Sequence, residues 1–249
     1  MPAAPVSERP DADAGHIVPF DSGKHAGLGL DRERYREFAA RRHACPVTLP
    51  EFFYASRHYP LVFVKSASGT MQASAVTGLR SEENLFVDAQ GEWLEQVYVP
   101  AFIRRFPFYA ADAPQCSPGQ KVITVDETGL EKSDDPFFDA AGEATDKWTA
   151  QEVLISDFIA AEQRTDEFAA ELEQLGLLEA FDARANPGRE GGLHVTGMHR
   201  VDEEKLNRLP SKTIKAMMSR GDLSRVYAHL ISLENFAKLL DLSAAGTAG

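Results

Sequence analysis

The sequence predicts an α+β fold, with a mostly antiparallel sheet and packed helices first and a helical C-terminal half after it. Two observations support this. The runs "LVFVK", "QASAVTGL" and "NLFVD" are separated by the turn-forming stretches "SASGTM" and "RSEE", as in consecutive antiparallel strands. After residue 149, apolar residues recur at spacings of three and four, which is the period of a helix.

Helices flank the predicted strands of the N-terminal part. "LDRERYREFAARRH" favours a helix with Asp31 as its N-cap. In "TLPEFFYASRHYP", Thr48 and Glu51 have the spacing of a capping box, and Pro60 should end that helix near His58. "KVITVDE" alternates apolar and polar residues and predicts one more strand.

The C-terminal half contains several helix boundaries. Thr149 and Glu152 predict the start of a helix of about 26 residues that ends at Gly176. "LHVTGMHRV" predicts a strand, and Asp202 caps the short helix "DEEKLNRL". Gly221 separates the last two helices, and the final one continues its apolar face to Leu240. No internal repeat is found.

Four regions follow from this reading. We expect a disordered tail over residues 1–22 and an α+β sheet region over 23–140. A mainly helical region with one strand should span 141–243, packed on the first region as a single unit. A short disordered tail should follow over 244–249.

Composition excludes several classes of partner. The 249 residues carry a formal charge of −12, which argues against nucleic acid and against a polybasic membrane anchor. No run approaches the roughly 18 apolar residues of a membrane span, so membrane insertion is not expected. The first twenty residues lack a signal-peptide pattern, and Cys45 and Cys116 lie outside any CxxC pattern. The sequence therefore predicts a cytoplasmic protein.

Common catalytic and metal-binding motifs are absent. We find no HExxH, no facial-triad start, no GxSxG elbow and no Walker loop. No catalytic residue, metal ligand or cofactor is therefore assigned. His229, in "RVYAHLISL", has two interpretations: a hydrogen-bonded core histidine, or a ligand-binding or catalytic residue of the last helix.

The stretch "YVPAFIRRFPF" contains the most concentrated functional signal. Pro100 suits the first turn of a helix that Pro107 ends. Arg104 and Arg105 then have three interpretations: structural pairing with an acid such as Asp88 or Asp126, binding of an anionic ligand, or plain exposure. Together with Trp93 and Tyr98, they predict an aromatic-lined site at the edge of the sheet.

Six stretches in order resemble the SapC family of bacterial proteins: "YPLVFVK", "GLRSEENLFVDAQGEW", "YVPAFIRRFPF", "FFDAAGEAT", "VDEEKLNRL" and "YAHLISLENFAKLL". The resemblance covers roughly residues 45 to 240. The family is named after a surface-layer gene locus. Its members tend to be encoded near outer-membrane receptors, tryptophan-halogenase-like proteins and cupin-like proteins. No activity or catalytic residue comes with the resemblance.

These observations favour a non-catalytic accessory protein with a binding or adaptor role, whose ligand is a small anionic molecule, a sugar derivative or a peptide. The expected ligand-binding residues are Trp93, Tyr98, Arg104, Arg105 and His229. Two alternatives stay open: an enzyme that modifies peptides, sugars or aromatics, and a structural protein of the surface layer or of secretion. A homodimer through the Thr149–Leu175 helix or the C-terminal helix fits each alternative, as does a complex with a halogenase-like protein.

Overall fold

The computed structural model describes residues 17–112, 121–185 and 193–246. Within these residues the chain forms two compact units, and each is assembled from separated stretches. Unit 1 contains residues 40–100 and the part of the chain from 161 onward. Among the described residues, unit 2 contains 17–39 together with 101–160. This division differs from the predicted one, which placed a single boundary near residue 140.

The α+β class is confirmed, and the largest sheet lies in unit 1. Its strand order is β3-β5-β4-β10-β9, with every neighbouring pair antiparallel. The strands are β3 (Ala44–Pro46), β4 (Leu61–Lys65), β5 (Met71–Val76), β9 (Leu178–Ala185) and β10 (Leu193–Val201). The predicted hairpin of β4 and β5 is confirmed, and so is β10. The prediction of one C-terminal strand is wrong, because β9 pairs with β10 along its length.

Local capping chemistry sets several helix boundaries of unit 1. Glu51 Oε2 accepts hydrogen bonds from Thr48 N (2.9 Å) and Thr48 Oγ1 (2.8 Å), where a 3₁₀ turn (Leu49–Glu51) leads into α2 (Phe52–Ala55). Asp202 accepts a hydrogen bond from Lys205 N (3.0 Å) and caps α5 (Glu203–Asn207). The left-handed Gly221 separates α6 (Ser211–Arg220) from α7 (Asp222–Ser232). These boundaries agree with the prediction.

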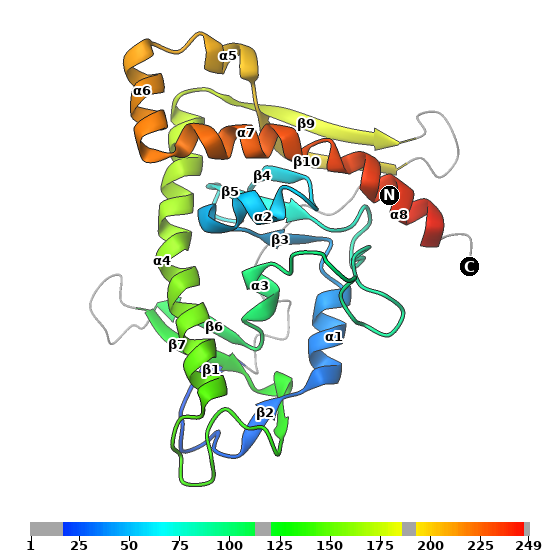
Figure 1. The fold of residues 1–249 in the computed structure, drawn as a ribbon, viewed down its shortest axis with the longest axis vertical. Helices are drawn as coiled ribbons and strands as arrows, with labels where there is room; N and C mark the ends of the chain where they lie inside the picture. Colours follow the sequence, from blue (N-terminus) through cyan, green and yellow to red (C-terminus); the bar gives the residue numbers. More distant parts are fainter. Residues whose placement is uncertain (1–16, 113–120, 186–192, 247–249) are drawn as a thin grey trace. The chain divides into compact units, whose positions relative to one another are not determined.

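The C-terminal helix is not continuous. α7 ends at Ser232, and α8 (Asn235–Gly246) begins after a short turn, so the prediction of one final helix is wrong. α7 runs across β10 and β4 and also packs against α2 (Figure 1). α8 continues to Gly246, which corrects the predicted tail over 244–249 for its described residues.

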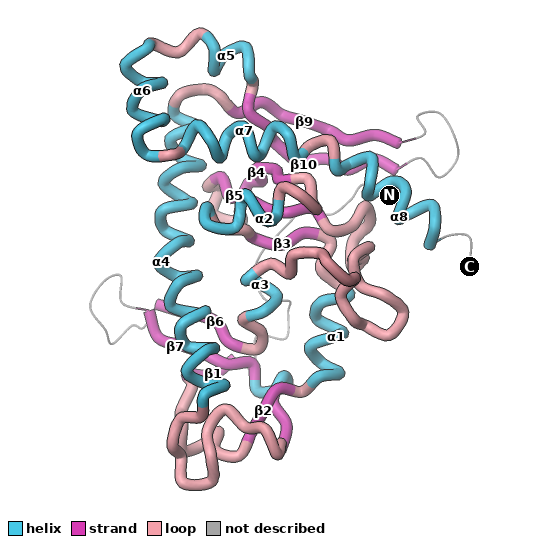
Figure 2. The backbone as a smooth tube through the Cα atoms, viewed as in Figure 1, coloured by secondary structure: helices cyan, strands magenta, loops and turns pink. Residues whose placement is uncertain are grey.

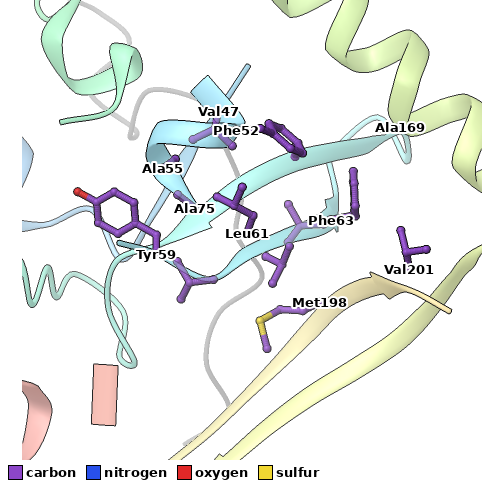
Figure 3. Packing of buried hydrophobic residues seen from close by; sticks show 14 of the residues in the cluster. Val47, Phe52, Ala55, Tyr59, Leu61, Phe63, Ala75, Ala169, Met198 and Val201 are labelled. Atoms are coloured by element: carbon purple, nitrogen blue, oxygen red, sulfur yellow. The ribbon is translucent and has the colours of Figure 1, made fainter. Parts of the chain in front are cut away.

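A single apolar core occupies unit 1. Figure 3 shows part of it, with Phe52 and Ala55 of α2 above the strand residues Leu61 and Phe63. Phe168 of α4 joins this core, with its ring centroid 6.1 Å from that of Phe52. Cys45 is buried with a free thiol, and Cys116 lies outside the described residues. The five-stranded sheet is therefore fixed on at least one face by helices from distant parts of the chain.

Unit 2 has two small sheets. One has the order β1-β7-β6, and the other pairs β2 with β8. The strands are β1 (Ile17–Pro19), β2 (Leu28–Leu30), β6 (Phe108–Asp112), β7 (Lys121–Asp126) and β8 (Leu130–Lys132). Strand β1 corrects the predicted tail over 1–22, because Ile17–Pro19 pair with β7. A second apolar core contains the aromatic residues Phe20, Phe108, Phe137, Phe138 and Trp148.

This region also contains the helices α1 (Arg32–Ala40), α3 (Ala101–Arg104) and α4 (Asp146–Gln174), and a 3₁₀ turn (Glu127–Gly129). α4 has 29 residues and contributes to both units. It begins at Asp146 and not at Thr149, because Thr145 Oγ1 accepts from Trp148 N at 3.4 Å. Its end is as predicted: Gly176 has φ 67°, and Leu177 N donates to Leu172 O at 3.0 Å.

Residues 77–100 form loops and turns between β5 and α3 (Figure 2). The predicted strand "NLFVD" is therefore wrong; its only ladder contact is the isolated bridge from Val87 to Trp93. Its aspartate instead closes a tight turn. Asp88 Oδ1 accepts hydrogen bonds from Gln90 N and Glu92 N, both at 2.9 Å, and Asp88 N donates to Glu92 O at 2.8 Å.

This turn occurs twice, which corrects the statement that the chain has no repeat. In "FFDAAGEAT" of unit 2, Asp139 Oδ1 accepts from Ala141 N (2.8 Å) and Glu143 N (2.9 Å), and Asp139 N donates to Glu143 O (3.0 Å). The glycines have φ 79° at Gly91 and 81° at Gly142, a conformation that favours glycine. We call residues 86–94 the first turn and residues 137–145 the second turn.

Candidate ligand-binding site

Tyr59 is the centre of an aromatic cluster in unit 1. Its hydroxyl donates to the Tyr98 carbonyl oxygen and accepts from Trp93 Nε1 at 3.1 Å. Its ring meets that of Phe86 edge to face, with centroids 4.6 Å apart. Burial raises the pKa of the Tyr59 hydroxyl well above its ordinary value. Figure 3 shows this hydroxyl pointing away from the labelled core residues.

Tyr98 connects this centre to the surface. Its hydroxyl donates to Glu51 Oε1 at 3.0 Å, and its ring stacks on Tyr54 with centroids 5.7 Å apart. The Tyr54 side chain is 58% exposed. The cluster of Tyr54, Tyr59, Phe86, Trp93 and Tyr98 is thus hydrogen-bonded on its inner side and presents an open ring on its outer side.

Lys238 contacts the aromatic cluster, and Arg57 acts electrostatically on the neighbouring His58. Lys238 Nζ lies 5.2 Å from the Phe86 ring centroid, in cation–π contact. Burial first, and then the positive charges of Lys238 and Arg57, lower the pKa of His58, whose ring lies 6.1 Å from that of Tyr59. His58 is therefore held towards its neutral form between two permanent cations. Within the described residues, neither Arg57 nor Lys238 forms an ion pair with a carboxylate.

Asn235 fixes this arrangement. Its Nδ2 donates to Ser56 O (2.8 Å) and Tyr59 O (3.2 Å), which ties the start of α8 to the segment after α2. Lys238 lies one helical turn after Asn235 and therefore faces the same segment. The cationic rim of Arg57 and Lys238 is consequently built from residues far apart in the sequence.

The side chains of this site are suited to binding a ligand. The Tyr59 hydroxyl is fully engaged and has a raised pKa, so it is a poor acid or base at neutral pH. An exposed ring can stack on a flat or apolar ligand surface, and unpaired cations attract a carboxylate or phosphate. The surface suits an anionic molecule that also carries an aromatic or sugar ring.

The two arginines of "YVPAFIRRFPF" belong to unit 2. The Arg105 guanidinium lies over three rings: 4.5 Å from the Phe158 centroid, 5.0 Å from Phe102 and 5.2 Å from Tyr109. Gln151 Nε2 donates to the Arg105 carbonyl at 3.0 Å. Arg104 is exposed. Their predicted pairing with Asp88 or Asp126 stays a prediction; described oxygens of those acids accept hydrogen bonds within their own turns.

His229 lies in the core of unit 1 and is 0% exposed. Its Nδ1 donates to Leu61 O at 2.8 Å, and its Nε2 accepts from Val201 N at 3.0 Å, so it connects β4 to the end of β10. Burial lowers the pKa of His229 to about 4, against the smaller opposing effect of the Leu61 carbonyl. Both nitrogens are engaged, which is the geometry of a structural histidine.

Among the described residues, no group of three or more His, Cys, Asp or Glu side chains is arranged to hold a metal ion. In the same residues, no helix has both the length and the apolar character needed to cross a membrane.

Comparison with known proteins gives one match. The model of the SapC family matches residues 20–239. The chain belongs to the SapC family. No curated protein and no solved structure matches it. The SapC match includes both turns, the aromatic cluster and the cationic rim, since all of these residues lie within the matched range.

Of the predicted site residues, the structure brings together Trp93 and Tyr98, which share the Tyr59 hydroxyl as a partner. The site residues missed from the sequence are Tyr54, Arg57, Tyr59, Phe86 and Lys238. Tyr54 and Arg57 lie in "EFFYASRHYP", which contains four Phe or Tyr residues and two basic groups in one short stretch. Lys238 carries no local signal, because its role depends on the position of α8.

Proposed function

We propose that this SapC-family protein is a non-catalytic binding protein for an anionic ligand that carries a flat ring. The ring would stack on Tyr54 and Tyr98, and the carboxylate or phosphate would pair with Arg57 and Lys238. The ligand class includes small aromatic acids, acidic sugar derivatives and the terminus of an acidic peptide. A cytoplasmic setting is part of this proposal.

The observation that carries the proposal is Lys238, which lies over the Phe86 ring of the aromatic cluster and forms no ion pair with a carboxylate within the described residues. Lys147 of unit 2 makes a similar ring contact, with its Nζ 4.9 Å from the Phe137 centroid. Lys147 also pairs with Asp135 Oδ2 at 2.8 Å, whereas no carboxylate pairs with Lys238 within the described residues. A cation that has no carboxylate partner can pair with an anion from solution.

Calorimetric titration with 4-hydroxyphenylacetate and its neutral amide tests the proposal. We expect the acid to bind about tenfold more tightly than the amide, which corresponds to about 1.4 kcal/mol. Lys238→Gln should remove this preference, and Tyr54→Ala should weaken both ligands. Lys147→Gln is the matched control and should leave both affinities unchanged.

Three results would contradict the proposal: equal affinity for acid and amide, an unchanged preference in Lys238→Gln, or the same loss in Lys147→Gln. An acidic sugar such as glucuronate, compared with glucose, repeats the test for the second ligand class. Retention of the melting temperature in each variant would show that the loss reflects binding and not unfolding.

A further inference from the structure

A second surface of unit 1 combines exposed apolar side chains with positive charge. Among the described residues, three large hydrophobic side chains are exposed on α6 and α7: Met218 (70%), Tyr227 (39%) and Ile231 (70%). Phe53 and Tyr54 are exposed on α2, beside the candidate site. Large exposed apolar side chains that gather on adjoining elements mark interaction surfaces more often than isolated ones do.

Met218 lies in the last turn of α6, and Tyr227 and Ile231 lie on α7, which follows directly after Gly221; Figure 1 shows the bend between the two helices. Gly221 N donates to Met218 O at 3.1 Å, and Ser224 Oγ donates to Gly221 O at 2.7 Å. Tyr227 and Ile231 are then one turn apart on α7. We call Met218, Tyr227 and Ile231, together with Lys212 and Lys215, the α6–α7 corner.

Positive charge is concentrated at this corner. Residues 205–225 contain six Lys or Arg and one Asp. The rest of the chain therefore has 26 − 6 = 20 basic and 38 − 1 = 37 acidic residues. Such a basic segment in an acidic chain is a local field that attracts acidic partners.

Three of these six basic residues are neutralised by ion pairs, and three are not; of the latter, Arg225 donates from Nη1 to the Gly221 carbonyl oxygen at 2.7 Å. The ion pairs are Lys205 with Asp202 (3.3 Å), Arg208 with Glu204 (2.9 Å), and Arg220 with Glu171 and Asp222 (2.7 Å each). Lys212 and Lys215 are exposed and have no ion pair within the described residues. Lys215 precedes Met218 by three residues, so both lie on the same exposed face of α6.

We propose that the α6–α7 corner docks an acidic amphipathic helix of a partner protein. Apolar residues of the partner at helical spacing would cover Met218, Tyr227 and Ile231, and its acidic residues would pair with Lys212 and Lys215. Methionine adapts its shape to different apolar surfaces, which suits a docking face. This surface shares no residue with the candidate ligand-binding site, and the proposal does not depend on the proposed function.

An anionic membrane is a weaker match for the same corner. Each basic residue near a membrane surface contributes about 1 kcal/mol, so two unpaired lysines supply about 2 kcal/mol. Stable membrane attachment requires a second strong anchor, and the net charge of −12 opposes approach to an anionic surface. An acidic helix, by contrast, could bind to the α6–α7 corner without any second anchor on the protein.

Fluorescence anisotropy with two designed peptides tests the proposal on the full chain. The first is a labelled amphipathic helix of about 18 residues with leucines at helical spacing and glutamates elsewhere, and the second has lysines in place of the glutamates. We expect the protein to bind the acidic peptide at least about tenfold more tightly than the basic one. The double variant Lys212→Glu/Lys215→Glu should invert this preference.

Apolar variants complete the test. Ile231→Glu and Met218→Glu should each weaken the acidic peptide by about tenfold, whereas Val153→Glu, at an exposed apolar residue of unit 2, should not. All of these positions are exposed, so circular dichroism should show unchanged folding.

Four results would overturn the proposal. The first two are equal affinity for both peptides and an unchanged preference after charge reversal. The third is co-sedimentation with phosphatidylglycerol vesicles, lost in Met218→Glu, without peptide binding. The fourth is a dimer by light scattering that Ile231→Glu converts to monomer, because a second copy would then be the occupant.

Discussion

The first and second turns have the same backbone and different surroundings. Both follow the pattern F-x-D-A-x-G-E, and in both a buried phenylalanine carbonyl accepts from the amide eight residues later: Phe86 O from Leu94 N (2.8 Å), and Phe137 O from Thr145 N (3.1 Å). In both turns a lysine ammonium group also lies over the phenylalanine ring: Lys238 over Phe86, and Lys147 over Phe137. The local chemistry is therefore fixed by the pattern itself.

The difference begins after the shared glutamate. In the first turn Trp93 follows, and its indole N–H donates to Tyr59 in the aromatic cluster. In the second turn Ala144 and Thr145 follow, and Thr145 Oγ1 donates to Phe137 O at 2.9 Å at the start of α4. The lysine of the second turn is neutralised by Asp135, and that of the first is not. The second turn therefore has a structural role at the start of α4, and the first turn supports the candidate site.

The substitutions with the largest expected effect test whether the two turns have different roles. Phe86→Ala and Phe137→Ala each remove a buried ring, so each should destabilise the protein by about 3–5 kcal/mol. Only Phe86→Ala should also weaken 4-hydroxyphenylacetate, because its ring supports Lys238. Chemical denaturation measures the first quantity and calorimetry of the folded protein the second. Equal loss of binding in both variants would contradict a functional difference between the turns.

The next effect concerns the buried histidine of the unit that holds the first turn. Because burial lowers the pKa of His229 to about 4, the unfolded chain takes up a proton there at higher pH than the folded chain. The resulting stability is complete above the unfolded value near 6.5 and is lost as the pH falls towards 4. The difference corresponds to about 3 kcal/mol at most.

Hydrogen exchange of β4 and β10 amides between pH 6.5 and 4, corrected for intrinsic rates, measures this loss, with β6 and β7 of unit 2 as the reference. His229→Gln should be less stable at pH 7 and should show a flatter dependence over the same interval. An identical slope in wild type and variant would exclude His229 as the titrating group.

The smallest effect tests the shared backbone. Asp88→Ala and Asp139→Ala each remove an acceptor from two exposed backbone amides, so each should cost about 1 kcal/mol. Similar costs in the two variants, measured by denaturant unfolding, would confirm that the turns are equivalent. A cost several times larger at one position would show that its surroundings, and not the pattern, hold that turn.

The sequence predicts best those features that depend on neighbours along the chain. The Thr48–Glu51 box, the Asp202 cap, the end of α4 at Gly176 and the β4–β5 hairpin are all decided within a few residues. β9 was missed because "LEAFDARA" mixes charged and apolar residues and becomes a strand only by pairing with β10. The break after Ser232 is likewise invisible in a continuous apolar pattern.

In the candidate site, too, the residues predicted from the sequence are those that are close to one another along the chain. Trp93 and Tyr98 are close in sequence and were predicted together, and both contact Tyr59. Lys238 reaches the cluster only because Asn235 ties α8 to Tyr59, a contact between distant residues. The repeated turn was missed because its common residues are few and their neighbours differ.

The division of the chain between the two units limits how it can be cut into fragments. The chain passes between the two compact units at residues 39–40, 100–101 and 160–161, the last of these inside α4. Neither unit can therefore be excised as one uninterrupted fragment, nor fused as a cassette to another gene. A continuous fragment that contains all of unit 2 ends at residue 160 and therefore also carries residues 40–100 of unit 1.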